Sequence, residues 1–181
     1  MRILALSLPL LVVACAGGVS RLSAIEPVEQ EVYRLGPGDD LRLAVYGFDQ
    51  MANVYTVSDS GTISLPLLGT VKAEAQTPAE FEAAIAEQLV ARELATKPSV
   101  SVQVVKYRPI YILGEVQKPG QYPYVPGMTV TTAVAIAGGY TFRASTKAAA
   151  VSRGGDTAER RAPRTARVMP GDTIRVPEAW F

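Results

Sequence analysis

The fold of this chain is decided by residues 111–140, which read YILGEVQKPGQYPYVPGMTVTTAVAIAGGY. Tyr111 opens a short run of strand-forming residues, and the Pro-Gly pair that follows is typical of a tight turn with a positive φ at Gly120. In the returning strand, Tyr122 and Tyr124 can share one face. Pro123 places that strand at a sheet edge or a bulge, because proline lacks the N–H that a central strand needs.

The second half of the stretch predicts a short helix. Thr129 is a residue type preferred at an N-cap, and Gly138 and Gly139 supply the C-cap. The expected buried face consists of Val130, Ala133, Val134 and Ala137. This strand–turn–strand–helix layout resembles the soluble-ligand-binding β-grasp (SLBB) domain. That small module recurs in proteins that export polysaccharide across bacterial envelopes.

The first 14 residues are typical of a bacterial secretion signal. Arg2 supplies a minimal basic region, and residues 3–13 form an apolar run that is too short for a transmembrane helix of about 20 residues. The run ends in LVVAC at residues 11–15, which resembles a lipobox and implies lipid attachment at Cys15. The alternative is cleavage elsewhere, which leaves Cys15 as a free thiol.

A lipid on Cys15 predicts stable membrane attachment, because each buried acyl methylene contributes about 0.8 kcal/mol. By resemblance to lipoproteins, Ala16 after the cysteine favours sorting to the outer membrane, which implies a protein anchored at its periplasmic face. Residues 15–31 carry small and polar side chains without clear periodicity, and we interpret them as a tether.

The side-chain inventory excludes several classes of site. The chain has 18 Lys and Arg against 17 Asp and Glu, with no basic stripe, so nucleic acid is not expected as a partner. It has no histidine and one cysteine, which excludes His-based triads, His metal sites, Cys-rich zinc sites and structural disulfides. No Gly-rich phosphate loop occurs. We therefore expect no metal, no cofactor and no enzymatic activity.

Two turns of the chain share one pattern. Residues 37–43 read PGDDLRL and residues 170–176 read PGDTIRV. In each, Pro-Gly forms a turn, the aspartate can accept hydrogen bonds from backbone amides beyond it, and a strand with one buried face follows. We expect structural roles for Asp39, Asp172 and the arginines that follow them. A carboxylate-dependent enzyme acting on glycan, through Asp39, Asp40 or Asp59, is kept as an alternative.

The first half of the chain contains further strand and helix signals. A turn at residues 59–61 predicts a hairpin between strands 55–57 and 62–65. Residues 77–80 read TPAE, a capping box with proline at the first helical position. The expected buried face of this helix consists of Phe81, Ala84, Ile85 and Leu89. Alternating valines at residues 100–104 predict a strand with one buried face.

These motifs give the first half its own resemblance. Residues 32–106 resemble the polysaccharide-export domain through the GPGD opening at 36–39, the DSGTISLPLLG run at 59–69 and the TPAE helix start. Residues 107–181 resemble the SLBB domain. The chain is thus identified as a member of the polysaccharide biosynthesis and export lipoproteins. This predicts an α+β fold of two small sheet-and-helix domains, the second, and by extension the first, of β-grasp type. Residues 154–167 are expected to form an exposed loop or a ragged hairpin.

The resemblance implies a non-catalytic role in moving polysaccharide. In the family, such lipoproteins assemble into homo-oligomeric rings that conduct exopolysaccharide or capsule. An inner-membrane polysaccharide co-polymerase, often associated with a tyrosine kinase, meets the ring from below. Residues 177–181 are too few to cross about 30 Å of hydrocarbon, so we expect no pore formed by this chain and a separate outer-membrane β-barrel as partner. The alternative is a periplasmic glycan-binding or assembly lipoprotein that forms no channel.

Contact residues are expected among the tyrosines, because their rings stack on sugar faces while their hydroxyls form hydrogen bonds. The candidates for contact with glycan or a neighbouring subunit are Tyr111, Gln117, Lys118, Tyr122, Tyr124 and Tyr140. Core packing of the alternating strand tyrosines remains the competing interpretation. Trp180 and Phe181 fit either an interfacial contact or packing on their own domain.

Overall fold

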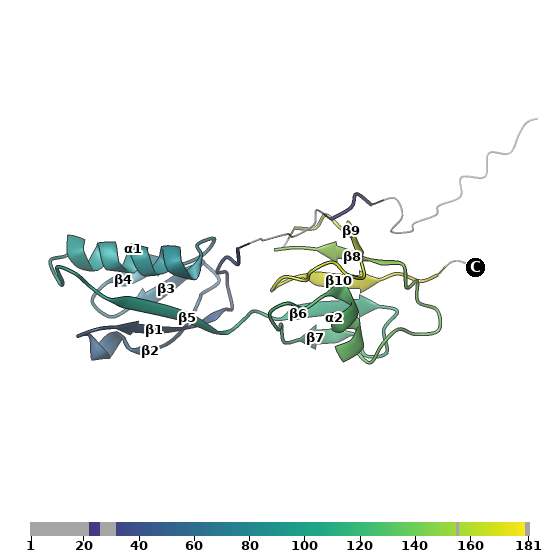
Figure 1. The fold of residues 1–181 in the computed structure, drawn as a ribbon, viewed down its shortest axis with the longest axis horizontal. Helices are drawn as coiled ribbons and strands as arrows, with labels where there is room; N and C mark the ends of the chain where they lie inside the picture. The colour runs from purple at the N-terminus through teal and green to yellow at the C-terminus, as the bar shows by residue number, and fades with distance from the viewer. Residues whose placement is uncertain (1–21, 26–31, 155, 180–181) are drawn as a thin grey trace, which may run out of the picture.

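The computed structural model describes residues 22–25, 32–154 and 156–179, and their apolar side chains form two separate cores. Figure 1 shows two lobes placed end to end, joined by the chain that leaves β5 and enters β6. We call residues 33–106 lobe 1, and residues 110–179 together with residues 22–25 lobe 2. Residues 107–109, between them, are the connector.

Lobe 1 combines an antiparallel sheet of order β2-β1-β5, a β3-β4 hairpin and a helix. Its elements are β1 (Asp40–Val45), the short 3-10 helix η2 (Asp49–Met51), β2 (Asn53–Thr56), β3 (Thr62–Leu65), β4 (Gly69–Lys72), α1 (Pro78–Ala91) and β5 (Val100–Lys106). Along β1, Leu41, Leu43 and Val45 are buried while Arg42 is exposed. The predicted alternation is therefore confirmed, and this face forms the floor of the first core.

Helix α1 begins as its sequence predicts. The backbone N–H of Thr77 donates to the Glu80 carboxylate at 2.8 Å, and the N–H of Glu80 donates to the Thr77 hydroxyl at 3.1 Å. This reciprocal pair satisfies two amides that the first helical turn leaves without partners. Phe81, Ile85 and Leu89 form the buried stripe of the helix. The helix thereby closes the core of lobe 1.

The hairpin predicted between strands 55–57 and 62–65 is wrong in its pairing. A turn does form at residues 58–61, but β2 pairs with β1, and β3 pairs with β4. Val57 is already bound to the turn before β1: its N–H donates to the Asp39 carbonyl, and its carbonyl accepts from Gly38, both at 2.9 Å. The backbone of Val57 is therefore used before β3 begins.

Lobe 2 is built on a five-stranded sheet of order β7-β6-β10-β8-β9. Its elements are β6 (Ile110–Gly114), β7 (Gly120–Tyr122), α2 (Val130–Ile136), β8 (Ala148–Ser152), β9 (Arg160–Pro163) and β10 (Thr173–Val176). Strands β6 and β10 are parallel, and the other neighbours are antiparallel. The buried side chains of α2 share one core with Ile110, Ile112 and Ile174, so the helix covers one face of the sheet.

Helix α2 follows its predicted boundaries closely. Thr129 is the N-cap, and Gly138 and Gly139, with φ of +85° and +89°, end the helix. Gly120, however, does not occupy a left-handed turn. It opens β7 with a nearly extended φ of 159° and pairs with Ile112. The chain reverses earlier, because the N–H groups of Gln117 and Lys118 bind the carbonyls of Gly139 and Ala137 at 3.0 and 2.9 Å.

Residues 23–25 lie along the outer edge of β9. The N–H of Ile25 donates to the Arg161 carbonyl, and the N–H of Arg161 donates to the Ser23 carbonyl, both at 2.7 Å. The Ile25 side chain is buried in the core of lobe 2. These residues fall within the predicted tether. The predicted signal peptide, Cys15, Trp180 and Phe181 lie outside the described residues.

The observed elements confirm an α+β fold built of small mixed sheet-and-helix units. The finer assignment of the lobes to the β-grasp class stays a prediction. Neither α1 nor α2, the α-helices of the described part of the chain, is long and apolar enough to span a bilayer.

Candidate functional site: a groove between the lobes

A groove of about 510 Å³ lies where the two lobes meet. One wall comes from the turn before β1 and from the end of β5, and the other comes from β7 and the chain that follows it. The residues that line it are Gly38, Val105, Lys106, Tyr107, Pro109, Gln121, Tyr122, Pro123, Tyr124, Val125 and Pro126. The surface is thus rich in tyrosine and proline, with few polar groups.

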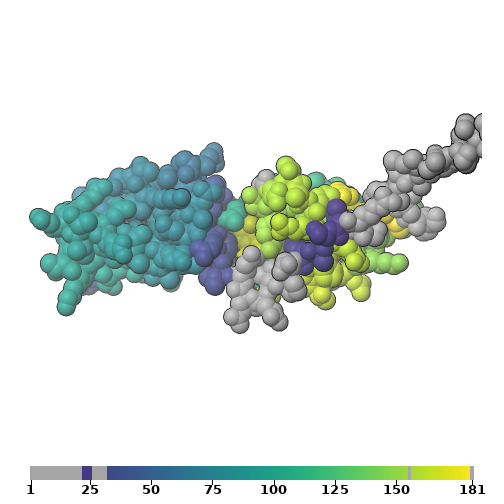
Figure 2. Space-filling view, turned by 90° about the horizontal axis from the view of Figure 1, so that it is seen from above, coloured from purple at the N-terminus to yellow at the C-terminus, as the bar shows by residue number. Residues whose placement is uncertain are grey.

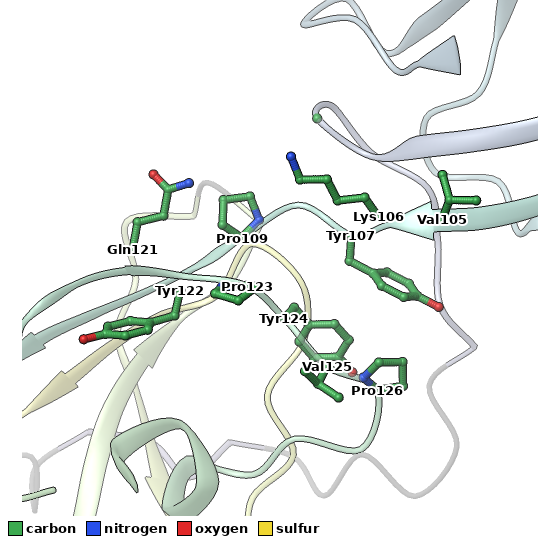
Figure 3. A pocket seen from close by; sticks show the side chains of 11 residues that line it. Val105, Lys106, Tyr107, Pro109, Gln121, Tyr122, Pro123, Tyr124, Val125 and Pro126 are labelled. Atoms are coloured by element: carbon green, nitrogen blue, oxygen red, sulfur yellow. The ribbon is translucent and has the colours of Figure 1, made fainter. Parts of the chain in front are cut away.

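Three tyrosine rings form a row from one lobe to the other. The ring centroid of Tyr107 lies 5.0 Å from that of Tyr33 and 5.4 Å from that of Tyr124, and both contacts are edge-to-face. Tyr33 belongs to lobe 1 and Tyr124 to lobe 2, so the connector residue Tyr107 joins them. Figure 3 shows the rings of Tyr107 and Tyr124 turned toward each other at the groove. Edge-to-face pairs of this kind favour a fixed geometry.

The Lys106 and Gln121 side chains of the groove lie on the side of Pro109 away from the rings of Tyr107 and Tyr124 (Figure 3). In Figure 3, the ammonium group of Lys106 and the amide of Gln121 point to the same side, flanking Pro109. None of the described lining residues is acidic. Burial raises the pKa of the Tyr124 phenol above its ordinary value of 10.0, so the hydroxyl keeps its proton and can both donate and accept. Such a groove suits a neutral or anionic hydroxyl-rich ligand.

A buried carboxylate lies behind the groove. Asp39 is fully buried and accepts from the N–H of Gly36 and the N–H of Arg108, both at 2.8 Å, and from the Tyr33 hydroxyl. The Arg108 guanidinium completes the shell at 3.1 Å. Burial, followed by the hydrogen bond to Asp39, raises the pKa of Tyr33 far above its ordinary value. Asp39 is therefore a structural acceptor, and its oxygens are occupied.

The structure divides the predicted contact residues among three places. Tyr122 and Tyr124 line the groove. Tyr111 lies on the exposed face of β6, next to Leu113, with 42% and 45% of their surfaces accessible.

Gln117, Lys118 and Tyr140 lie at the end of α2. The Gln117 amide donates to the Tyr140 carbonyl at 3.0 Å, and the Lys118 carbonyl accepts from the Tyr122 hydroxyl at 2.6 Å. The first bond fastens the β6–β7 turn to the segment that follows α2, and the second ties the turn to β7. Tyr122, which also lines the groove, links this turn to it.

Sequence reasoning missed Lys106, Tyr107 and Arg108. It treated this segment only as a boundary between domains. A signal was present, because a flexible linker is usually rich in glycine and serine, whereas residues 106–109 read KYRP. Bulky aromatic and charged residues in a short connector indicate a packed joint.

The carboxylates considered for catalysis do not converge. Asp40 accepts from the exposed Thr56 hydroxyl at 2.6 Å, and Asp59 is an exposed turn residue. No group of three His, Cys, Asp or Glu side chains placed to hold a metal ion occurs among the residues that the structure describes. The described residues therefore offer a groove, rather than a group of converging carboxylates, as the candidate site.

Two family models match the chain in succession. Residues 27–105 match the polysaccharide biosynthesis/export protein family, and residues 109–162 match the SLBB domain. The chain belongs to the polysaccharide biosynthesis/export family. The two matches meet at the connector, so this export-family chain carries its groove where the two modules join. The family names point to transport rather than catalysis.

The curated relatives that match this chain are named for exopolysaccharide production or polysaccharide export. The exopolysaccharide production protein ExoF of Rhizobium meliloti is 38% identical over 147 residues, which cover 73% of this chain and 32% of the relative. The EPS I polysaccharide export outer membrane protein EpsA of Ralstonia nicotianae is 34% identical, and the match covers 60% of this chain and 28% of the relative. EpsA of Ralstonia solanacearum is 32% identical, and the match covers 59% of this chain and 35% of the relative. The export-family chain thus spans about a third of the length of the relatives it matches.

Proposed function

We propose that this chain is a periplasmic component of a polysaccharide export conduit, anchored to the outer membrane through a lipid on Cys15. The observation that carries the proposal is the succession of an export module and an SLBB module that meet at a tyrosine-lined groove. The EpsA relatives, named as outer membrane export proteins, support the location. A conduit needs a weakly binding wall and no catalytic group.

The groove is the proposed contact with the polymer. Tyr107, Tyr122 and Tyr124 offer ring faces and hydroxyls to sugar units, and the prolines beside them add rigid apolar surface. Lys106 supplies a positive charge for acidic substituents on the polymer. Because a translocated chain has to move on, shallow and repeated contacts serve better than one deep pocket.

Copies of the chain are proposed to form a ring that works as an adaptor to a separate outer-membrane pore. Head-to-tail contacts between identical subunits close into a ring when the rotation per subunit allows. The exposed pair Tyr111 and Leu113 and the turn carrying Gln117 and Lys118 are the proposed subunit contacts. The inner-membrane co-polymerase and its tyrosine kinase would meet the ring from the periplasm and deliver exopolysaccharide or capsule polymer.

Deletion of the gene tests the export role. Surface polymer should be lost while polymer accumulates inside the envelope, and the intact gene should restore the surface fraction. Complementation with Tyr107→Ala should restore less polymer than Tyr46→Ala, a matched tyrosine in lobe 1 that is 88% exposed and lies outside the groove. Normal surface polymer in the deletion strain would contradict the export role.

The groove itself also favours a second candidate, a periplasmic glycan-binding lipoprotein that forms no channel. Native mass spectrometry and electron microscopy of the detergent-extracted protein separate the two. Closed rings support the conduit, whereas a monomer that binds oligosaccharide supports the second function. Fractionation of Cys15→Ser tests the anchor: the variant should leave the membrane fraction, and continued acylation would defeat the lipobox interpretation.

A further inference from the structure

The two Pro-Gly-Asp turns of the chain have the same internal geometry. In the first, the N–H of Gly36 donates to Asp39 at 2.8 Å, and in the second the N–H of Met169 donates to Asp172 at 2.8 Å. Both aspartates are fully buried, and each meets an arginine at 3.1 Å: Arg108 for Asp39, and Arg153 for Asp172. The sequence repeat is therefore also a structural repeat, with one copy in each lobe.

Arg108 differs from Arg153 because it binds both turns. Its N–H and guanidinium bind Asp39 in lobe 1, while its Nε donates to the Pro170 carbonyl in lobe 2 at 3.0 Å. The guanidinium carbon also lies 5.7 Å from the centroid of the Tyr33 ring. One side chain of the connector thus holds the turn of each lobe, and an arginine fork is suited to such simultaneous contacts.

Both turns approach this side chain so closely that a Cβ on Gly36 or Gly171 would force Arg108 to move. A Cβ on Gly36 would lie 2.3 Å from Nη1 of Arg108, and one on Gly171 would lie 2.8 Å from its Nε. The N–H of Gly171 also donates to the Pro109 carbonyl at 3.1 Å, which ties the second turn to the connector. Gly36, which precedes the first motif, and Gly171 of the second motif therefore leave room for Arg108 at the contact between the lobes.

The groove depends on this joint because its walls come from different lobes. Gly38 belongs to the first turn, and residues 121–126 belong to lobe 2. Figure 2 shows the narrow contact between the lobes, with the residues that precede β1 at the junction. A change in the angle between the lobes would separate Gly38 from the opposite wall and break the ring contact of Tyr107 with Tyr124.

We propose that Arg108 is a positioning residue that fixes the two lobes relative to each other and thereby shapes the groove for the polymer. This inference rests on the proposed glycan contact. Without the fork of Arg108, Asp39 keeps a buried charge with fewer partners, and the lobes lose the bond that spans them. The groove then exists in its binding form for only part of the time.

Spin labels on the two lobes test the joint directly. In the full chain with Cys15→Ser, labels are attached at Glu87→Cys on α1 and Lys147→Cys before β8, both exposed positions. We expect one narrow distance distribution for the parent and a broad one for Arg108→Gln. Arg153→Gln is the matched control, because its arginine–aspartate pair has the same 3.1 Å distance and burial but both members lie in lobe 2. Its distribution should stay narrow.

Binding completes the test, with partial hydrolysis fragments of the bacterium's own secreted polysaccharide as the probe. If the competent arrangement falls to about one tenth of the population, affinity falls about tenfold in Arg108→Gln. Arg108→Lys, which keeps the charge without the fork, should give an intermediate result and serves if Arg108→Gln does not fold.

Three results would overturn the proposal. The first is a distribution in Arg108→Gln that is as narrow as the parent's. The second is a broadened distribution with unchanged binding, which would show that the joint does not shape the site. The third is a parent protein that binds none of the fragments, which defeats the glycan contact itself. The label distances then still show whether Arg108 holds the lobes together.

Discussion

Replacing Asp39 with asparagine should be far more costly than its small change in size suggests. The carboxylate accepts from Arg108 N–H through Oδ1, and from Gly36 N–H, the Tyr33 hydroxyl and the Arg108 guanidinium through Oδ2. Asparagine offers one acceptor oxygen and one NH₂ group. Whichever way the amide turns, its NH₂ faces at least one of these donors.

The less costly orientation places the amide oxygen at the Oδ2 position. One hydrogen bond to a charged group is then lost, at about 1.5–3 kcal/mol, and the ion pair with Arg108 weakens. Because Arg108 is 24% exposed, its charge can still reach water, which limits the second cost. We therefore expect a total loss of about 3 kcal/mol in the free energy of unfolding.

Asp40→Asn is the matched control, since Asp40 is the next residue and accepts a single exposed hydrogen bond from Thr56. Its replacement should cost about 0.5 kcal/mol. Urea unfolding followed by far-UV circular dichroism measures both variants; with a slope of about 2 kcal/mol/M, Asp39→Asn should lower the midpoint by about 1.5 M. Equal midpoints for Asp39→Asn and Asp40→Asn would refute the reasoning about the buried shell.

Three further predictions concern the two lobes separately. Phe81→Ala should lower the stability of lobe 1 by about 3–5 kcal/mol, seen as a shift of its urea transition, while an unshifted transition would contradict the central place of Phe81 in that core. The pKa of Tyr33 is raised above 10.0, so its contribution to folding stability is present below pH 10 and is lost as pH rises further. The melting temperature of Tyr33→Phe should therefore fall less at alkaline pH than that of the parent. The hydrogen bond from Arg175 lowers the pKa of Glu159 below 4.5, so its contribution is present above that pH and is lost as pH falls through the folded value. Between pH 5 and pH 3, the melting temperature of Glu159→Gln should therefore fall less than that of the parent. An equal fall in both proteins would exclude this pair as a cause of the acid decline.

Local signals in the sequence were sufficient where one short segment determines its own structure. The capping box at Thr77 and the N-cap at Thr129 involve only residues three positions apart, so both helix starts could be predicted. The alternation along β1 likewise reflects a single buried face. These elements fix the α+β class and the order of the strands along the chain.

Pairing between distant segments could not be predicted in the same way. The turn before β3 was expected to join β2 and β3, but the backbone of Val57 is already bound to Gly38 and Asp39. Gly120 was expected in a turn, but the chain reverses earlier because Gln117 is held by Gly139. The groove was missed for the same reason, since Arg108 and Pro170 come together only in the folded molecule.

The strip of backbone at residues 23–25 makes lobe 1 an insertion within lobe 2. The chain supplies a first segment to the edge of β9, departs to complete the whole of lobe 1, and returns to build the remaining sheet. A fragment that starts at residue 107 would consequently expose the backbone edge of β9 and leave the space of Ile25 empty, inviting self-association. During synthesis, too, this segment has to wait for its partner strand until β9 has been made.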